Sequence, residues 1–471
     1  MNDKKPHFWI PDEEVERVSK KPTGRTTPRD IVYSEHGAKL SYGLQLVKQA
    51  VEELKEDDSL HDAGLYVFKV ELPEGEKIQH QTDIFSKNGM HINAVKDERH
   101  AVVSTTRHQF QILRNRVKAY TVNGTNKTQF DYIESIAPYI GTEKNSGELR
   151  KKVYIDRPPE TVDIQLMFIP NLQSKDYAIA IEKVKEKIHI VQGQIQQDPY
   201  YLSDRTPVIR AVVPSSTLSR FENDSAIYRI EETRFFSVGV DDFLVNIPTS
   251  AQMTEEVNLD DLPVVVVLDS GISFPSPFDQ LVIEHWMAPF SSGGDREHGT
   301  RVASRVAFAQ LGEQLAVSQC ITPRARVVDC NILDGSVPEN IIIQRIQKAV
   351  ESYHEVSKIY NLSANANLPI EGDEMSIIGF ELDALQLKYG VQFVVSAGNH
   401  ELWKTETSID ELLDDDDSRI APPADSMLSI VVGAVISEDH VGSLSGKNII
   451  APYSRRGPGF AGFSKPDMCA Y

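Results

Sequence analysis

A short, continuous run of apolar residues from Val264 to Leu268 marks the stretch around which the second half of the chain is organised. Pro263 and Gly271 bound the run, and all of its residues except the last are β-branched. Such a run predicts a strand that is buried on both faces, in the middle of a parallel sheet. The run leads into Asp269, and open α/β sheets place their ligands and chemistry at the carboxyl ends of such strands. Taken alone, Asp-Ser-Gly is also typical of a turn that closes a strand.

From residue 262 onward, apolar runs alternate with stretches that have helical periodicity. This alternation predicts βαβ units and a mainly parallel sheet covered by helices. Strands are predicted at residues 325–333, 359–363, 391–396 and 428–435, and helices at residues 339–360 and 376–389.

The first half of the chain has a different pattern. Residues 1–35 combine prolines and charges with little periodicity, which predicts a flexible arm. Residues 36–155 read as an α+β domain of unknown role. In residues 156–240 the order β-α-β-α-β suggests a split βαβ domain, and residues 241–261 form an acidic linker. Within residues 36–155 the pattern predicts a helix at 40–54, strands at 64–72 and 101–106, a short helix at 83–95, and a helix or a strand at 111–120.

Composition and charge limit the partners and the cellular location that we expect. The formal net charge is −20, which argues against nucleic acid and anionic membranes as partners, because both attract clustered Lys and Arg. No apolar run reaches the length of a membrane span, and the N-terminus lacks the apolar core of a signal peptide. Three cysteines are too few for a disulfide framework, so we expect a reducing, cytoplasmic location.

Three short motifs fall at predicted strand or helix ends in the second half. They are Asp269-Ser-Gly, His298-Gly-Thr and Ser396-Ala-Gly-Asn399. Each alone is more typical of a turn or a cap. Together they supply a carboxylate to orient an imidazole, the imidazole as general base, and an amide that donates to a developing oxyanion. The glycines after Asp269 and His298 allow the backbone to pass close to these side chains.

On these motifs, residues 262–471 resemble the catalytic domain of the subtilisin-like serine proteases (subtilases, peptidase S8), in particular bacterial-type cytoplasmic members with a long N-terminal region. The order of acid, then histidine, matches that family. Further similar stretches are Thr322–Asp334, Asn361–Ser363, Ile430–Val435, Tyr453–Pro458 and Lys465–Asp467.

The resemblance implies a three-layer α/β domain with a mainly parallel sheet, preceded by α+β domains, and the activity of a serine endopeptidase on polypeptides. It makes Asp269 the triad acid, His298 the base and Asn399 the oxyanion donor. It also implies a substrate channel and a first specificity pocket lined by Ser363, Ala364, Asn365, Ser396, Ala397 and Gly398. The split βαβ region then resembles a propeptide that blocks the site, although another binding role for such a module stays open.

Two departures from the family pattern bear on activity. In the family, a Gly-Thr-Ser motif with the nucleophilic serine follows shortly after Lys-Pro-Asp, but the 471 residues end at Tyr471 without it. Ser454 matches a different stretch and is not a substitute. Either the serine lies beyond Tyr471, or the protein is an inactive, protease-like fold that binds peptides or a partner. The second departure is Ser363-Ala-Asn-Ala366, where the family commonly has glycine.

Cofactors and further partners are weakly indicated. The acidic run of residues 414–417 invites calcium, which subtilases often bind, but four consecutive carboxylates do not reproduce a spaced ligand set, and a solvated loop is the simpler interpretation. The histidines show no metal-ligand spacing. A partner ATPase is suggested by analogy alone. Another α/β hydrolase is disfavoured because no Gly-x-Ser-x-Gly elbow is present.

Overall fold

The computed structural model describes residues 30–237, 251–254, 257–318, 320–372, 374–405, 408–439 and 441–471. Contacts divide the chain into two compact units. The first takes its described residues from Met1–Lys55 and Gly64–Tyr139, and the second takes them from Glu56–Ala63 and Ile140–Tyr471. Most of the predicted arm of residues 1–35 lies outside the described residues, and helix α1 already begins at Tyr33.

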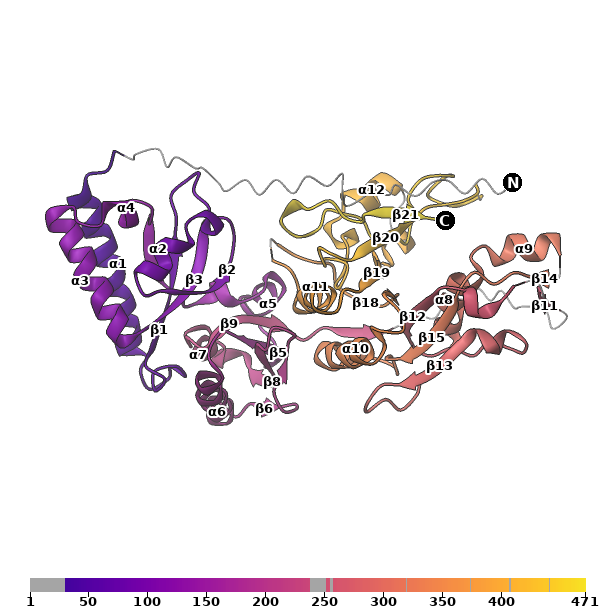
Figure 1. The fold of residues 1–471 in the computed structure, drawn as a ribbon, viewed down its shortest axis with the longest axis horizontal. Helices are drawn as coiled ribbons and strands as arrows, with labels where there is room; N and C mark the ends of the chain where they lie inside the picture. The colour runs from indigo at the N-terminus through magenta and orange to yellow at the C-terminus, as the bar shows by residue number, and fades with distance from the viewer. Residues whose placement is uncertain are drawn as a thin grey trace. The chain divides into compact units, whose positions relative to one another are not determined.

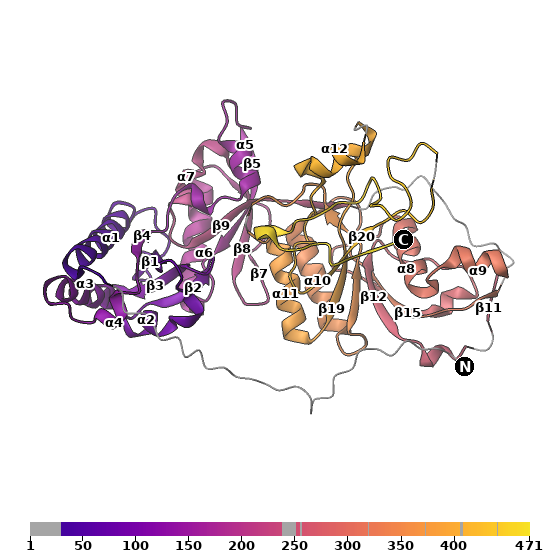
Figure 2. The same cartoon turned by 90° about the horizontal axis from the view of Figure 1, so that it is seen from above.

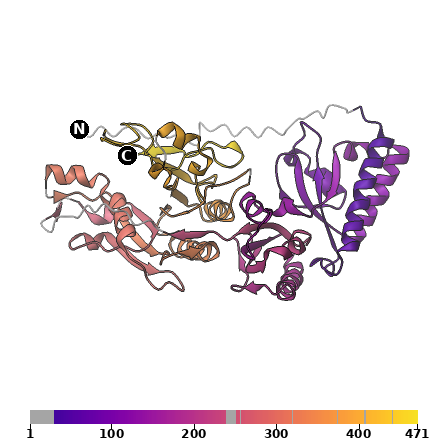
Figure 3. The same cartoon turned by 180° about the vertical axis from the view of Figure 1, so that it is seen from behind.

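The first unit is an antiparallel sheet with the strand order β2-β3-β1-β4. Apolar residues of α1 and α3 share one core with β1 and β3, and the two helices lie side by side in Figures 1 and 3. The Thr106 side chain caps α3 and Gly124 ends it in the left-handed conformation, so the segment 111–120 is helical. The elements are α1 Tyr33–Glu53, β1 Leu65–Glu71, α2 Thr82–Lys87, β2 His91–Val95, β3 His100–Thr106, α3 Arg107–Asn123, α4 Lys127–Phe130 and β4 Ser135–Pro138.

The predicted helix over residues 83–95 is wrong in its second half. Helix α2 ends at Lys87, and Gly89 takes a φ of +68°. The next residues, His91–Val95, form strand β2, which pairs with β3. Glycine reaches positive φ at little cost, so it turns the chain into the strand at this point.

Two short segments that we expected in the 36–155 domain instead contact the second unit. The Ser59 N–H donates to Asp224 Oδ1 at 3.2 Å, and Asp224 forms a buried ion pair with Lys187. The Gly141 N–H donates to Glu222 O at 3.0 Å. These buried polar contacts place residues 56–63 and 140–153 with the second unit.

Residues 140–237, called the βαβ region here, form a mixed α+β layer. The sheet order is β6-β8-β5-β9 and all pairs are antiparallel, which is the order of a split βαβ sandwich. Its elements are α5 Gly147–Val153, β5 Thr161–Phe168, α6 Ser174–Ile190, β6 Gln194–Ile195, β7 Tyr200–Tyr201, β8 Pro207–Pro214, α7 Ser219–Glu222, β9 Ile227–Glu232 and β10 Phe235–Ser237.

The rest of the second unit, the C-terminal domain of residues 261–471, is built on a seven-stranded parallel sheet. The strand order is β13-β15-β12-β17-β19-β20-β21, with β12 near the middle (Figure 2). The strands are β12 Val264–Asp269, β13 Val282–Met287, β15 Arg326–Asn331, β17 Ile359–Leu362, β19 Gln392–Ser396, β20 Ile430–Ala434 and β21 Met468–Ala470. The helices are α8 Glu297–Phe308, α9 Leu311–Val317, α10 Glu339–Tyr353, α11 Ile377–Tyr389 and α12 Ile409–Asp414.

Helices cover both faces of this sheet. Val266 and Leu268 belong to one core cluster with the apolar residues of α10 and α11. Val267, which points to the opposite face, belongs to another cluster with Ala303 and Ala307 of α8. Successive residues of a strand point to opposite faces, so residues 266–268 are buried on both sides, and the strand lies in the middle of three layers. The predicted α/β fold class is confirmed.

Of the predicted linker, residues 241–250 and 255–256 lie outside the described residues. Part of the remainder is ordered into the C-terminal domain, because β11 Gln252–Met253 pairs with β14 Cys320–Ile321.

Candidate active site

Asp269 is the last residue of β12, which is the strand at which the order of strands in the sheet reverses. Strand β12 pairs with β15 on one side and with β17 on the other. The loops that leave these strands therefore diverge at the carboxyl end of β12, which is the usual position of a site in an open α/β sheet. The side chain of Asp269 is buried, with 1% exposed.

His298 lies on the first turn of α8, facing Asp269. Its Nδ1 is 2.8 Å from Asp269 Oδ1, and its side chain is 21% exposed. The carboxylate can only accept in this contact, so Nδ1 donates and Nε2 is the basic nitrogen. The Ser270 N–H also donates to Asp269 Oδ1, at 2.7 Å. The two predicted residues thus form a pair in which a fixed carboxylate orients a partly exposed imidazole.

The two glycines of these motifs allow the strand end and the helix to meet. A Cβ atom on Gly299 would lie 2.3 Å from Gly271 O, and Gly271 itself takes a φ of +103°. The Gly299 N–H donates to Ser270 Oγ at 3.2 Å. Only glycine satisfies both the close approach and the positive φ without strain, so these positions fix the distance between Asp269 and His298.

Asn399 is exposed and follows β19 in the sequence. Arg455 holds the backbone of Asn399, because its Nε donates to Asn399 O at 2.9 Å. Other guanidinium nitrogens of Arg455 donate to Asp417 O at 2.7 Å and to Asn367 O at 2.9 Å. Burial lowers the pKa of Arg455 to about 10, against the attraction of Asp417. A buried cation therefore ties the Asn399 loop to two neighbouring segments; the sequence analysis missed it.

The predicted substrate-binding residues lie on two adjacent segments. Leu362 pairs with Val395 at the ends of β17 and β19, so the residues that follow each strand continue side by side. One segment carries Ser363, Ala364 and Asn365, and the other carries Ser396, Ala397 and Gly398. Ala364, Ala397 and Gly398 are buried, whereas the others are partly exposed.

A strand of the βαβ region lies against the first of these segments. Strand β10 pairs antiparallel with β16 (Val337–Pro338) on one side and with β18 (Asn365–Ala366) on the other. Phe236 of β10 is 1% exposed and is part of the core of the C-terminal domain. An extended segment thus already lies between β16 and β18, next to the segment that carries Ser363, Ala364 and Asn365. The sequence analysis placed these residues at the end of the βαβ domain and did not predict this pairing.

The C-terminal domain matches a known family over its whole length. Residues 261–471 match the family model of the subtilases (Peptidase_S8, subtilase family). By this match, residues 261–471 are similar to the subtilase family. We call this part of the chain the subtilase domain.

Three of the solved structures that the chain matches are proteases by name, and the first of these is called a serine protease. The epidermin leader peptide processing serine protease EpiP from Staphylococcus aureus is 12% identical, with 66% of this chain and 76% of that chain covered and a TM-score of 0.37. The prenylagaramide maturation protease PagA is 20% identical, with 42% and 58% covered and a TM-score of 0.25. The patellamide maturation protease PatA is 20% identical, with 41% and 61% covered and a TM-score of 0.27. This chain therefore spans less than two thirds of the length of the two maturation proteases. A comparison with curated protein sequences gave no match.

A second histidine–carboxylate pair lies on the neighbouring strands of the subtilase domain. His285 Nδ1 on β13 is 2.7 Å from Asp329 Oδ2 on β15, and the Ile272 N–H donates to the same oxygen at 3.0 Å. Burial raises the pKa of Asp329, although His285 and Ile272 oppose the shift. The imidazole is 56% exposed. The sequence analysis missed this pair because the two residues follow no recognised motif.

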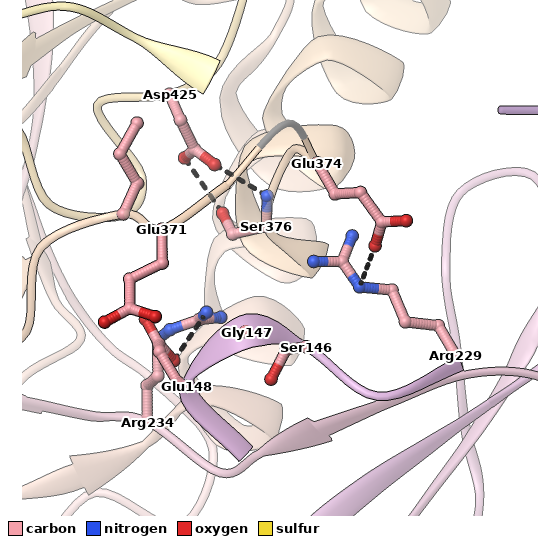
Figure 4. A pocket seen from close by; sticks show the side chains of 10 residues that line it. Ser146, Gly147, Glu148, Arg229, Arg234, Glu371, Glu374, Ser376 and Asp425 are labelled. Atoms are coloured by element: carbon pink, nitrogen blue, oxygen red, sulfur yellow. Dashed lines mark hydrogen bonds and ion pairs between the residues drawn. The ribbon is translucent and has the colours of Figure 1, made fainter. Parts of the chain in front are cut away.

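The subtilase domain contacts the βαβ region through buried charges beside a cavity of about 10 Å³ (Figure 4). Arg234 lies 2.9 Å from Glu148 Oε2, and Arg229 lies 3.3 Å from Glu374 Oε2 of the subtilase domain. The cavity is close to the smallest volume that holds one water molecule, so this is a packed contact rather than a substrate pocket.

Glu339, at the start of α10, is a fully buried carboxyl group of this contact. Gln165 of the βαβ region donates to Glu339 Oε2 at 2.8 Å, and Arg234 lies 3.8 Å from the same oxygen. Burial and the neighbouring Glu231 carboxylate raise the pKa of Glu339 to about 8, against the pull of Arg234.

The acidic run forms the end of α12 and the 3₁₀ turn Asp416–Ser418. Asp415 caps that turn by accepting from the Asp417 N–H at 2.8 Å. Among the described residues, no group of three or more His, Cys, Asp or Glu side chains is arranged to hold a metal ion. A calcium ion at this loop stays a prediction from the resemblance.

Within the described parts of the chain, every helix is too short or too polar to cross a membrane.

Proposed function

We propose that the complete protein is a serine endopeptidase that hydrolyses polypeptides with an Asp-His-Ser triad. The observation that carries the proposal is the hydrogen bond between His298 and the buried Asp269 at the carboxyl edge of the subtilase sheet. A carboxylate in this position holds the imidazole in one tautomer and stabilises the imidazolium that forms during acyl transfer. His298 then acts as the general base towards a serine hydroxyl and as the general acid towards the leaving amine.

Asn399 is assigned to the developing oxyanion. Its side chain is exposed beside the strand ends, while Arg455 fixes its backbone from behind. An amide donor that is held before the reaction begins stabilises the tetrahedral intermediate without the cost of reorganisation.

The nucleophile is assigned to sequence that follows Tyr471 in the complete protein. The 471 residues contain the Lys465-Pro-Asp467 stretch but no Gly-Thr-Ser after it. Ser454 is 4% exposed and its hydroxyl is engaged by backbone groups, including the Ala434 N–H at 3.0 Å, which supports excluding it as the nucleophile.

Substrate is proposed to bind as an extended strand in the groove that β10 fills. Strand β10 is antiparallel to β16 and β18, and addition of a strand to a sheet edge is a general mode of peptide binding. The βαβ region then acts like a propeptide, because a substrate has to displace β10 before it reaches His298. The composition of the chain and its three free cysteines support a reducing, cytoplasmic location for this activity.

The proposal is tested by peptide hydrolysis in the complete protein with two histidine variants. His298→Ala removes the base, and we expect a loss of at least about 10³-fold in kcat, since general-base catalysis and the nucleophile act as one unit. His285→Ala is the matched control, because it removes an imidazole of the same kind from the neighbouring Asp329. Equal activity of the His298→Ala protein and the wild type would refute the proposal.

The alternative function is an inactive, protease-like protein that binds a peptide or a partner. The observation that favours it is the filled groove: β10 satisfies both neighbouring edges. The coding sequence after Tyr471 discriminates between the two functions. Continuation through Gly-Thr-Ser supports the endopeptidase, and a stop codon at that point supports the binding protein.

A further inference from the structure

The side chain of Asn365 lies across the gap between the segment that follows β17 and the segment that follows β19. The Nδ2 of Asn365 donates to Ser396 O at 2.9 Å and to Ala421 O at 3.2 Å. In the opposite direction, the Ser396 hydroxyl donates to Asn365 Oδ1. Both ends of the amide are therefore engaged, and the side chain is fixed across the gap.

Backbone hydrogen bonds to residues 421 and 422 also join the two segments. The Ala366 N–H donates to Pro422 O at 2.8 Å, and the Ala421 N–H donates to Ala397 O at 3.3 Å. The position of a Cβ on Gly398 would lie 3.4 Å from Asn365 Cγ. The amide thus packs directly against the opposite wall, and little room is left between the two segments at this level.

A peptide bound in the register of β10 passes over this amide. Ser237 of β10 pairs with Asn365, so in that register a peptide residue two positions further on lies opposite Ser363. Leu362 pairs with Leu268 of β12, and Ser363 therefore stands level with Asp269. Under the proposed function, the residue opposite Ser363 is the one whose carbonyl is attacked, and its side chain faces the gap that Asn365 crosses.

We infer that Asn365 determines specificity by closing this gap, so that the peptide residue before the cleaved bond must be small: glycine, alanine or serine. The inference rests on the proposed function and adds the substrate class to it. A larger side chain has to displace an amide that makes three hydrogen bonds, and the polar groups left behind lose their partners, which costs free energy.

The test compares peptides that differ only at the residue before the cleaved bond, hydrolysed by the complete protein. For the wild type we expect kcat/KM with alanine to exceed that with phenylalanine by at least about 100-fold. In Asn365→Gly the side chain is absent, and the phenylalanine-to-alanine ratio of kcat/KM is expected to rise at least about 10-fold. Because the ratio compares two substrates of one protein sample, partial misfolding does not change it.

Lys348→Ala is the control, because Lys348 is an exposed residue of α10 whose ion pair is with Glu351 of the same helix. We expect its ratio to stay within about threefold of the wild-type ratio. A wild type that prefers phenylalanine, or an unchanged ratio in Asn365→Gly, would overturn the inference while leaving the endopeptidase intact. If no peptide is cleaved and no serine is labelled by a fluorophosphonate, the proposed function fails, and the inference fails with it.

Discussion

The carboxyl edge of the subtilase sheet and the contact with the βαβ region both depend on buried carboxylates, but they use them differently. At the edge, one carboxylate, Asp269, faces one imidazole that stays 21% exposed. At the contact, Glu148, Glu231 and Glu339 surround the buried guanidinium of Arg234, and Arg229 also pairs with Glu231. The first arrangement leaves the imidazole partly accessible, whereas the second encloses all of its charged groups.

The difference teaches that a shifted pKa does not by itself identify a catalytic group. Perturbed carboxyl groups cluster at active sites, but ion networks produce the same shifts. Glu339 has a pKa raised to about 8, yet it is sealed between two packed regions and no substrate can reach it. The two regions differ in whether the partner of the carboxylate is accessible and in whether the carboxylate orients a single imidazole.

The largest effect is expected when the orientation at the sheet edge is broken. In Asp269→Asn the amide favours the wrong imidazole tautomer, and kcat of the complete protein should fall about 10⁴-fold. The thermal midpoint should change little, because the contact with the βαβ region is untouched. Activity within tenfold of the wild type would show that Asp269 does not orient His298 for catalysis.

Breaking the buried network should affect stability strongly instead. Arg234→Met leaves Glu148 without its cation and Glu231 with Arg229 alone, and the loss of one partner of a buried ion pair costs about 3–5 kcal/mol. Denaturant unfolding of the 471-residue chain measures this change. A loss below about 1 kcal/mol would mean that the buried carboxylates find other partners.

The pH dependence of the unfolding free energy gives a further test of the buried contact. The pKa of Glu339 is raised to about 8 in the folded chain, so the folded state holds a proton that the unfolded state loses above about pH 4.3. This contribution is fully present below that pH, falls by about 1.4 kcal/mol per pH unit as the pH rises, and levels off above the folded-state pKa. Glu339→Gln cannot titrate, and its unfolding midpoint should therefore depend less steeply on pH between about pH 5 and 9. Equal slopes in the two proteins would contradict the assignment.

The smallest effect is expected at the exposed rim of the same contact. Lys151 pairs with Glu371 at 2.8 Å, but its side chain is 75% exposed. An exposed ion pair contributes about 0–1 kcal/mol, so Lys151→Ala should leave the unfolding free energy nearly unchanged. It is the matched control for Arg234→Met, and a similar loss in both variants would remove the distinction between rim and core.

Much of the subtilase domain could be predicted because its signals are local. The apolar run at 264–268 is a central strand, and the alternation after it predicted helices α10 and α11 and strands β15, β17, β19 and β20. The Asp269 and His298 motifs also predicted the pair that lies in hydrogen-bond contact. These features depend on the periodicity of apolar residues and on glycines where two backbone segments lie close together. Both can be recognised in short stretches of sequence.

The rest depends on contacts between distant residues. Strand β10 has three residues and finds its partners about a hundred positions away, and nothing in its sequence specifies them. Strand β13 was missed because its residues are mostly exposed and do not alternate. The role of Arg455 appears only when carbonyl groups from three loops converge on one guanidinium.

The central claim, that His298 activates a serine nucleophile in the subtilase domain, is tested most directly by labelling the complete protein with a fluorophosphonate. We expect a single labelled serine in the sequence after Tyr471, and loss of that label in His298→Ala but not in His285→Ala. Absence of any labelled serine, or labelling that does not depend on His298, would contradict the account.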